Sequence, residues 1–194
     1  ILTRLVGSEM CIRDRAKHGA KVVVNDLGAG VDGSGADTTP AQAVVDEIKA
    51  LGGEAIVNDD DVSSWTGAKN MIDQTIDAFG TIDVVVNNAG ILRDRMLVNM
   101  TEDEWDAVIQ VHLKGTFAPS RHAAAYWRQL SKDRGEKVNA RIINTSSTSG
   151  LYGNIGQTNY GAAKAGIAAF TIIAARELAR IGVTVNAISP TAYT

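Results

Sequence analysis

The sequence predicts an α/β fold in which parallel strands form a doubly wound sheet. Two observations lead to this prediction: strand-like and helix-like segments alternate from residue 21 onward, and the helical segments are long enough to be crossover helices. Such alternation is typical of βαβ units, whose helices cover the faces of a parallel sheet. The chain has 194 residues, a suitable length for one such domain, and we expect residues 1–194 to form a single domain.

The individual elements follow from local pattern. Five segments are apolar and rich in β-branched residues, and we predict strands at 21–26, 54–57, 83–86, 140–144 and 183–188. Four segments carry apolar residues at helical spacing, and we predict helices at 38–51, 65–79, 101–130 and 158–181. The inward stripe of the first helix should comprise Val44, Val45, Ile48 and Leu51.

Four further expectations concern the ends and the burial of these elements. Thr101 and Glu104 have the spacing of a capping box at the start of the third helix. Gly182 should end the fourth helix. The apolar run 83–86 should be buried on both faces of the sheet. The charged stretch 131–139 should be an exposed loop.

The composition argues against several function classes. The formal net charge is −3, so the chain offers no basic surface for nucleic acid. No run of about 18 apolar residues is present, and residues 1–6 are too short, with Arg4 among them, for a signal peptide. Cys11 is the only cysteine, so we expect no internal disulfide and a cytoplasmic location. We predict no metal site.

A glycine pattern after the first predicted strand is weak evidence for a phosphate-binding loop. Gly28, Gly30 and Gly33 spell G-x-G-x-x-G. A phosphate loop must run directly into a helix, whereas here residues 36–40 intervene. We therefore predict a surface loop. Asp26, at the end of the strand, is better placed to accept hydrogen bonds from ribose hydroxyls and to repel a 2′-phosphate, which favours NAD over NADP. A turn cap is the alternative role for Asp26.

The chemistry is concentrated in residues 144–166. Tyr160 and Lys164 lie four residues apart on a predicted helix and therefore share a face. Tyrosine ordinarily has a pKa of about 10, and a nearby ammonium favours the phenolate. Ser147 follows an apolar strand, at the edge where ligands bind in open α/β sheets. Its hydroxyl could bind the same substrate oxygen; an ordinary turn serine is the alternative.

Together these residues resemble the active site of the short-chain dehydrogenase/reductase family, which has a Rossmann-like fold. The family's Asn-Asn-Ala-Gly motif is present at residues 87–90. By this resemblance, Tyr160 exchanges the substrate proton, Lys164 assists it and holds the nicotinamide ribose, and Ser147 orients the substrate oxygen. The resemblance also implies a secondary alcohol or ketone substrate and a homodimer or homotetramer built on the two long helices. The implied contacts to NAD are Asp26, Asp61, Val62, Asn88, Ala89, Gly90, Tyr160, Lys164 and Pro190.

Two departures from the family's pattern stand out. His112 replaces an asparagine that helps to hold a water near the lysine; a satisfied core histidine is the alternative. The same replacement, and the runs at 25–28, 87–95 and 152–160, resemble the hydroxyacyl-CoA dehydrogenase part of peroxisomal multifunctional enzymes and related 3-oxoacyl reductases. This favours 3-hydroxyacyl or 3-oxoacyl thioester substrates.

The second departure lies at the ends of the chain. The stretch 8–15 resembles a translated sequencing adapter, and a divergent helix is the alternative. We therefore expect the sheet to lack the family's first, central strand and its glycine-rich loop. We also expect it to lack the family's C-terminal end, which sets substrate specificity.

Two other functions are compatible with parts of the pattern. Sugar-nucleotide epimerases and dehydratases share Tyr-x-x-x-Lys, but the motif at 87–90 and the 13-residue spacing from Ser147 to Tyr160 favour the dehydrogenases. A non-catalytic relative that acts as an oligomer partner would lack a phosphate loop, as this chain does, but would not need Ser147, Tyr160 and Lys164.

Overall fold

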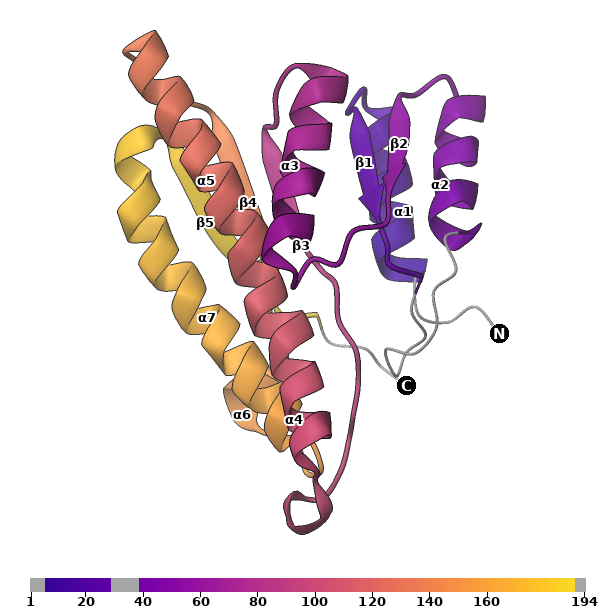
Figure 1. Ribbon diagram of the computed structural model, residues 1–194, viewed down its shortest axis with the longest axis vertical. Coiled ribbons are helices and arrows are strands. Elements are labelled where there is room, and N and C mark those ends of the chain that lie inside the picture. The colour runs from indigo at the N-terminus through magenta and orange to yellow at the C-terminus, as the bar shows by residue number, and fades with distance from the viewer. Residues whose placement is uncertain (1–5, 29–38, 191–194) are drawn as a thin grey trace. The chain divides into compact units, whose positions relative to one another are not determined.

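The computed structural model describes residues 6–28 and 39–190 (Figure 1). The chain divides into two compact units, with the boundary between Asp61 and Val62. The expectation of one domain over residues 1–194 stays a prediction. In the described part of the chain, no helix combines the length and the apolar character that crossing a membrane requires.

The first unit is a two-stranded parallel sheet packed with helices. Its elements are α1 (Val6–Lys17), β1 (Val22–Asn25), α2 (Thr39–Ala50) and β2 (Ala55–Asn58). Val44, Val45 and Ile48 of α2 are at most 2% exposed and form the core with residues of α1, β1 and β2. Leu51 is 64% exposed, contrary to the prediction, because α2 ends at Ala50 and the chain turns there.

The second unit carries the larger sheet. Its strands, β3 (Val84–Asn87), β4 (Ala140–Thr145) and β5 (Val183–Ile188), are all parallel, in the order β3-β4-β5. Its α-helices are α3 (Trp65–Phe79), α4 (Glu102–Ile109), α5 (Gly115–Arg134), α6 (Thr148–Tyr152) and α7 (Thr158–Leu178). Shorter helical turns are η1 (Leu97–Asn99), the π-helical η2 (Gln110–Lys114) and η3 (Ala179–Ile181). These parallel strands and crossover helices confirm the predicted α/β class.

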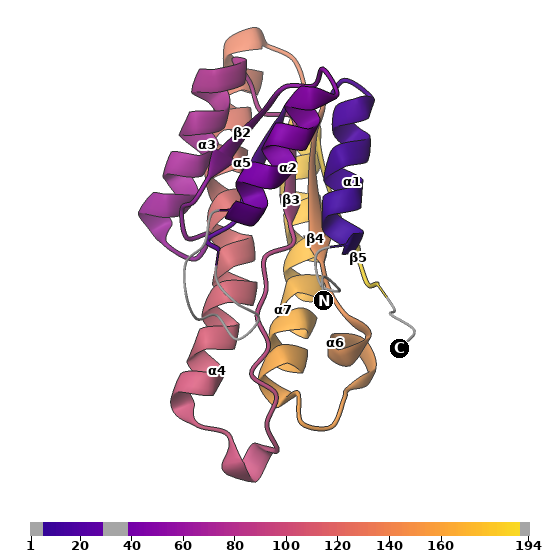
Figure 2. The ribbon, with the colours of Figure 1, turned by 90° about the vertical axis from the view of Figure 1, so that its right-hand side faces the viewer.

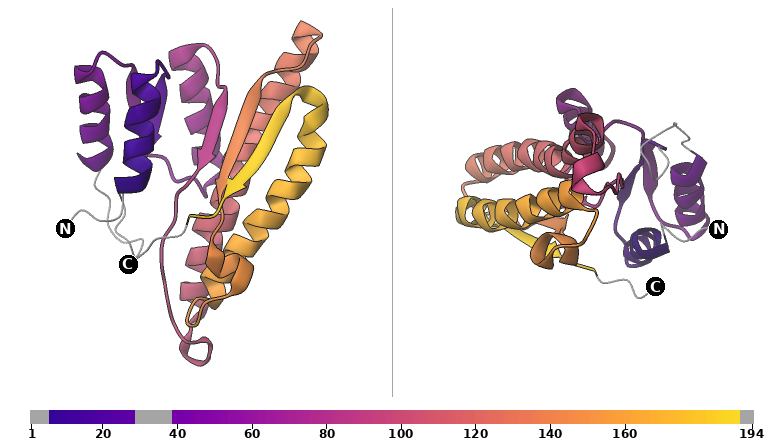
Figure 3. Two further views of the ribbon diagram at one scale, coloured as in Figure 1. Left: turned by 180° about the vertical axis from the view of Figure 1, so that it is seen from behind. Right: turned by 90° about the horizontal axis from the view of Figure 1, so that it is seen from below.

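One face of this sheet is covered by α5 and α7, which lie behind the strands in the left view of Figure 3. Val85 and Ile142 point into that core, where Trp127 is 1% exposed and donates its Nε1–H to the carbonyl oxygen of Ile82 at 2.7 Å. Val84 and Val86 alternate with Val85 and are about 45% and 44% exposed. The prediction that 83–86 is buried on both faces is therefore wrong, because the unit's own described helices pack on one face only.

Each of the two sheets has a strand that pairs on one side only within the described ranges, and the expected lack of a central strand stays a prediction. Among the strands of the described ranges, β1 pairs with β2 alone and β3 pairs with β4 alone. One edge of β1 and one edge of β3 therefore have no strand partner there. The stretch that resembles an adapter lies within helix α1 and thus takes the form of the alternative, a helix; its origin stays a prediction.

The helix ends follow their sequence signals, with one exception. The capping box of Thr101 and Glu104 is present at the start of α4, and Gly182 ends the last helical segment in the left-handed conformation, with φ of 89°. The helix predicted at 101–130 runs from α4 through η2 into α5 and continues to Arg134. Residues 131–134 are thus helical rather than part of a loop, because the left-handed Gly135 ends the helix only there.

Candidate active site

The carboxyl ends of β3 and β4 meet at one edge of the sheet, where two hydrogen-bonded asparagine side chains fix them. Asn87 and Asn144 are opposite each other in the register, and Asn87 Nδ2 donates to Asn144 Oδ1 at 2.8 Å. Asn144 is fully buried and donates in turn to Thr171 Oγ1 of α7 at 2.9 Å. Asn87 also donates to Ser120 Oγ of α5 at 2.9 Å. The strand ends are thereby tied to both covering helices.

Tyr160 and Lys164 stand in the first two turns of α7, above this edge. Lys164 is 3% exposed, and its ammonium donates to the carbonyl oxygen of Thr145, the last residue of β4, at 2.6 Å. The ammonium nitrogen lies 5.4 Å from the centre of the Tyr160 ring. The structure therefore brings together the two residues that the sequence pattern pairs. The hydrogen-bond acceptor of Lys164 is a main-chain oxygen, which every residue has, so the sequence could not identify it.

Burial lowers the pKa of Lys164 to about 8, since a buried ammonium loses its hydration. Burial thus raises the free energy of the charged lysine, and the carbonyl oxygen of Thr145 is the hydrogen-bond acceptor described for its ammonium group. A cation in such a place interacts strongly with any negative charge that forms beside it. This environment suits a lysine whose task is to stabilise an anion on the neighbouring tyrosine.

His112, in the π-helical turn between α4 and α5, is the third member of the cluster. It is 3% exposed, and its ring meets the Tyr160 ring edge-on with the centroids 5.1 Å apart. Its Nε2 lies 2.8 Å from the carbonyl oxygen and 3.2 Å from the amide nitrogen of Ile91. Its Nδ1 is buried and has no hydrogen-bond partner among the described residues. His112 thus touches Tyr160 while it holds the turn after β3.

The imidazole of His112 also explains the glycine at residue 90. A Cβ at Gly90 would lie 2.3 Å from Cε1 of His112, closer than atoms can approach. The glycine of the Asn-Asn-Ala-Gly motif is therefore required by a ring of the protein itself. The predicted contact of Gly90 with a cofactor stays a prediction.

His112 makes stability sensitive to acid. Burial, and then the positive charge of Lys164, lower the pKa of His112 to about 4, whereas the unfolded chain has the ordinary value of 6.5. The unfolded state therefore binds the extra proton first, and stability that is complete above pH 6.5 is lost as the pH falls toward 4. We expect the free energy of unfolding to decrease over this range by about 2 to 3 kcal/mol more in the native protein than in His112→Asn.

Urea unfolding of both proteins at pH 7.5 and pH 4.5 measures this difference. The asparagine variant is the matched control because its side chain is polar and does not titrate. Parallel losses of stability in the two proteins would show that the imidazole is not held neutral.

Ser147 lies on the turn between β4 and α7, where it caps the short helix α6. Its Oγ accepts a hydrogen bond from the amide of Ser149 at 3.2 Å, and its backbone is extended. Its neighbours hold this turn against α7: Ser146 Oγ donates to the carbonyl oxygen of Lys164 at 3.0 Å, and a Cβ at Gly150 would lie 2.6 Å from the amide nitrogen of Ala165. Figure 2 shows α6 beside the start of α7. The sequence did not predict α6, which has only 5 residues.

Two segments at this edge carry residues that the resemblance assigns to the cofactor, the turn after β3 and the residues after β5. Asn88, Ala89 and Gly90 are exposed, although Ile91 directly after them is buried. Asn88 Oδ1 accepts from Thr145 Oγ1 at 3.0 Å, so the exposed turn is fixed to the strand that binds Lys164. Beyond β5, Ser189 Oγ is buried without a partner among the described residues, and Pro190 follows it. The turn is thus open to solvent, and a buried hydroxyl without a described partner directly precedes Pro190.

The other predicted cofactor contacts are not brought to this cluster by any described contact. Asp26, in the first unit, accepts a hydrogen bond from the amide of Gly28 at 2.8 Å, which is the turn-cap role. Asp61 ends the first unit, and Val62 begins the second, where it lies against Gly115 of α5. Of the G-x-G-x-x-G pattern, Gly30 and Gly33 lie outside the described residues.

Comparison with known proteins agrees with this geometry. The family model of the short chain dehydrogenases matches residues 6–194. A hydroxyacyl-CoA dehydrogenase of Mycobacterium tuberculosis is 50% identical over 184 residues, which cover 92% of this chain and 55% of that enzyme. The peroxisomal multifunctional enzyme type 2 of Drosophila melanogaster is 49% identical over 177 residues, which cover 91% of this chain and 28% of that enzyme.

A solved structure supports the same assignment. The crystal structure of a short chain dehydrogenase from Mycobacterium avium superimposes with a TM-score of 0.84 at 58% sequence identity, over 91% of this chain and 62% of that protein. The chain thus spans about half the length of the first relative and less than two thirds of the solved structure. With the family model matching nearly all of its residues, this chain belongs to the short-chain dehydrogenase family.

Proposed function

We propose that the full-length product of this gene is a nicotinamide-dependent oxidoreductase that interconverts 3-hydroxyacyl and 3-oxoacyl thioesters. The observation that carries the proposal is the cluster of the half-buried Tyr160 with the buried Lys164 and His112 at the carboxyl edge of a parallel sheet. Ligands of open α/β sheets bind at this edge. The thioester class is supported by the hydroxyacyl-CoA dehydrogenase that is 50% identical.

Tyr160 is the proton donor and acceptor in this proposal. A bound nicotinamide cofactor supplies the hydride for ketone reduction and takes it up in alcohol oxidation. In reduction, the Tyr160 hydroxyl gives its proton to the substrate oxygen as the carbonyl carbon gains the hydride, and a phenolate remains. In oxidation the phenolate takes the hydroxyl proton back. Lys164, 5.4 Å from the ring centre, stabilises that phenolate, and Ser147 orients the substrate oxygen.

His112 takes part by holding a water. A neutral imidazole has one donor and one acceptor nitrogen. The shorter contact, 2.8 Å from Nε2 to the carbonyl oxygen of Ile91, favours Nε2 as the donor and leaves Nδ1 as an acceptor. Because Nδ1 is buried with no partner in the described ranges, we propose a water there, near Lys164, as a source of protons for Tyr160.

The assay for the proposed function uses the full-length gene product, NADH and acetoacetyl-CoA. We expect oxidation of NADH that depends on the thioester, at a kcat between about 1 and 1,000 per second. UDP-glucose, the substrate type of the sugar-nucleotide enzymes, should not be turned over. Inactivity with thioesters of every chain length would contradict the proposed function, and turnover of the sugar nucleotide would favour the alternative.

Asp26 is proposed to bind the adenosine ribose and so to select NAD. Asp26→Asn keeps an acceptor for the amide of Gly28 but removes the charge. We expect the affinity ratio of NADH to NADPH to fall about 10-fold, since a charge-assisted hydrogen bond contributes about 1.5 to 3 kcal/mol and the repulsion of the 2′-phosphate is removed. Fluorescence titration of both cofactors measures the ratio, and an unchanged ratio would reject the ribose role. Asp61, Val62, Asn88, Ala89 and Pro190 stay proposed cofactor contacts.

We also propose a homodimer or homotetramer built on the long helices. The outer faces of α5 and α7 carry exposed apolar side chains, of which Phe117 is 43%, Ile172 58% and Ile173 57% exposed. A contiguous patch of such side chains is typical of a surface that a partner covers. The cytoplasmic location stays a prediction from the single cysteine.

A further inference from the structure

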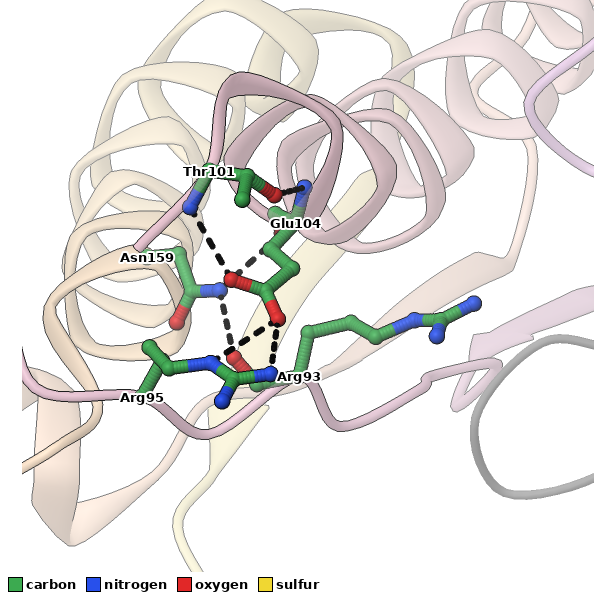
Figure 4. Close-up of polar contacts among 5 residues, drawn as sticks. All are labelled: Arg93, Arg95, Thr101, Glu104 and Asn159. Atoms are coloured by element: carbon green, nitrogen blue, oxygen red, sulfur yellow. Dashed lines mark hydrogen bonds and ion pairs between the residues drawn. The ribbon is translucent and has the colours of Figure 1, made fainter. Parts of the chain in front are cut away.

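Asn159, the residue directly before Tyr160, is fully buried, with 0% of its surface exposed. Its side chain makes three hydrogen bonds, each to a main-chain group. Nδ2 donates to the carbonyl oxygens of Arg93 and Glu104, both at 3.0 Å, and Oδ1 accepts from the amide of Tyr160 at 2.7 Å. Figure 4 shows the amide between the loop that carries Arg93 and the helix that carries Glu104.

These three bonds use the full donor capacity of a carboxamide. An asparagine offers two N–H donors and one oxygen, and each of the three meets a partner here. Aspartate has the same shape but no N–H when it is ionised, and no other side chain of this size combines the two functions. The chemistry of the site is therefore specific for asparagine and not merely for a small polar residue.

The bonds join three segments at the backbone of Tyr160. The amide of Tyr160 belongs to the first turn of α7, where N–H groups have no acceptor within the helix. The side chain of Asn159 supplies that acceptor and at the same time binds the loop after β3 and the helix α4. Eight residues beyond Glu104, the π-helical turn η2, which follows α4 directly, carries His112, whose ring meets the Tyr160 ring. The amide of Tyr160 is thus bonded to a side chain that is anchored on α4, and its ring contacts η2.

The carbonyl acceptors are themselves held in place. The Glu104 carboxylate accepts from Arg95 Nε and Nη2 at 3.0 and 2.6 Å and from the amide of Thr101 at 3.0 Å. Arg95 in turn donates its amide to the carbonyl oxygen of Gly156 at 2.7 Å, which ties the loop after β3 to the turn before α7. Figure 4 shows Arg95, Thr101 and Glu104 in one group beside the amide.

We infer that Asn159 is a positioning residue that sets the direction in which Tyr160 presents its hydroxyl. The inference rests on the proposed function, because it concerns the proton transfer by Tyr160. Displacements of about 1 Å at a reacting group cost on the order of 100-fold in rate. Loss of the three hydrogen bonds of the Asn159 side chain should therefore lower kcat and leave the affinity for NADH nearly unchanged.

The test compares Asn159→Asp with Glu104→Gln in the full-length gene product. We expect Asn159→Asp to lower kcat for acetoacetyl-CoA by about 10- to 100-fold at pH 8, where its carboxylate faces two carbonyl oxygens and cannot donate. Burial beside those oxygens raises the pKa of an introduced carboxyl group, and the protonated form can donate one bond. The ratio of variant to native kcat should therefore rise at least 3-fold between pH 8 and pH 6. A purely structural defect would not give this recovery.

Glu104→Gln is the matched control. It breaks the ion pair with Arg95 but leaves the main-chain oxygen that Asn159 binds, so the ratio of its kcat to the native kcat should be the same at both pH values. A ratio for Asn159→Asp that is equally independent of pH would overturn the inference.

Hydrogen exchange gives a second readout that does not depend on turnover. The Tyr160 amide and the segment 93–105 should exchange at least 10-fold faster in Asn159→Ala than in the native protein, and Glu104→Gln should leave the Tyr160 amide protected. Unchanged exchange in Asn159→Ala would overturn the inference even if the variant were inactive. If the native protein fails to reduce acetoacetyl-CoA, the proposed function is wrong. The exchange result still decides whether the side chain of Asn159 holds the Tyr160 amide.

Discussion

Tyr160→Phe should abolish nearly all reduction of acetoacetyl-CoA by the full-length gene product. The change removes one oxygen and keeps the ring, so the edge-on contact with His112 and the packing around it should persist. A positioned proton donor contributes about 100- to 10,000-fold to rate, and we expect a fall in kcat of this size. The free energy of unfolding and the affinity for NADH should change little.

The chain offers a matched control for this substitution. Tyr152, at the end of α6, is 84% exposed and has no role in the proposed mechanism. Tyr152→Phe removes the same atom eight residues earlier and should leave kcat as it is. If Tyr160→Phe turned over acetoacetyl-CoA as fast as Tyr152→Phe, Tyr160 could not be the proton donor.

The second large effect concerns Gly150, where helix α6 touches α7. A Cβ at this position would lie 2.6 Å from the amide nitrogen of Ala165 and 2.7 Å from the carbonyl carbon of Lys164. Both are main-chain atoms that cannot rotate away, so Gly150→Ala must push α6 off α7. We expect a loss of about 1 to 3 kcal/mol in the free energy of unfolding. Because Ser147 caps α6, kcat should fall by at least 10-fold as the serine moves.

Gly166→Ala is the control for Gly150→Ala. It adds the same methyl group to α7, but the nearest atoms are the methyl carbons of Leu113 at 3.1 and 3.3 Å, at the flexible end of a side chain. Alanine is the better helix former by about 1 kcal/mol, so this variant should be as stable as the native protein or more stable. Urea unfolding and initial rates measure both variants. Equal stability and activity in the two would show that the close approach at Gly150 has no consequence.

Much of the fold could be predicted from the sequence because the pattern and the packing agree. The spacing of apolar residues predicts α3 at the bounds the structure shows, and the five predicted strands are all present. Errors arise where tertiary context decides. Val84 and Val86 are as apolar as Val85, but their exposure depends on which helices cover each face of the sheet. The helix α6 is too short to show a period.

Some features of the candidate site could likewise be predicted from the sequence, and others depend on tertiary structure. Tyr160 and Lys164 could be paired from their four-residue spacing, since a helix brings such residues to one face. The acceptor of Lys164 is the main-chain oxygen of Thr145. Every residue has such an oxygen, so the sequence does not show which one accepts the bond. The contact between Gly90 and His112 joins residues 22 positions apart and depends on the path of the loop. The role of Asn159 likewise appears only when the three main-chain groups around it are seen together.

The most direct test of the central claim follows the hydride. The full-length gene product is supplied with acetoacetyl-CoA and NADH that carries deuterium at carbon 4 of the nicotinamide, on one face and then on the other. We predict that label from one of the two faces appears at carbon 3 of the hydroxyacyl product, one deuterium for each NADH oxidised. A product without deuterium at carbon 3 from either face, or thioester consumed without oxidation of NADH, would contradict the proposed hydride transfer.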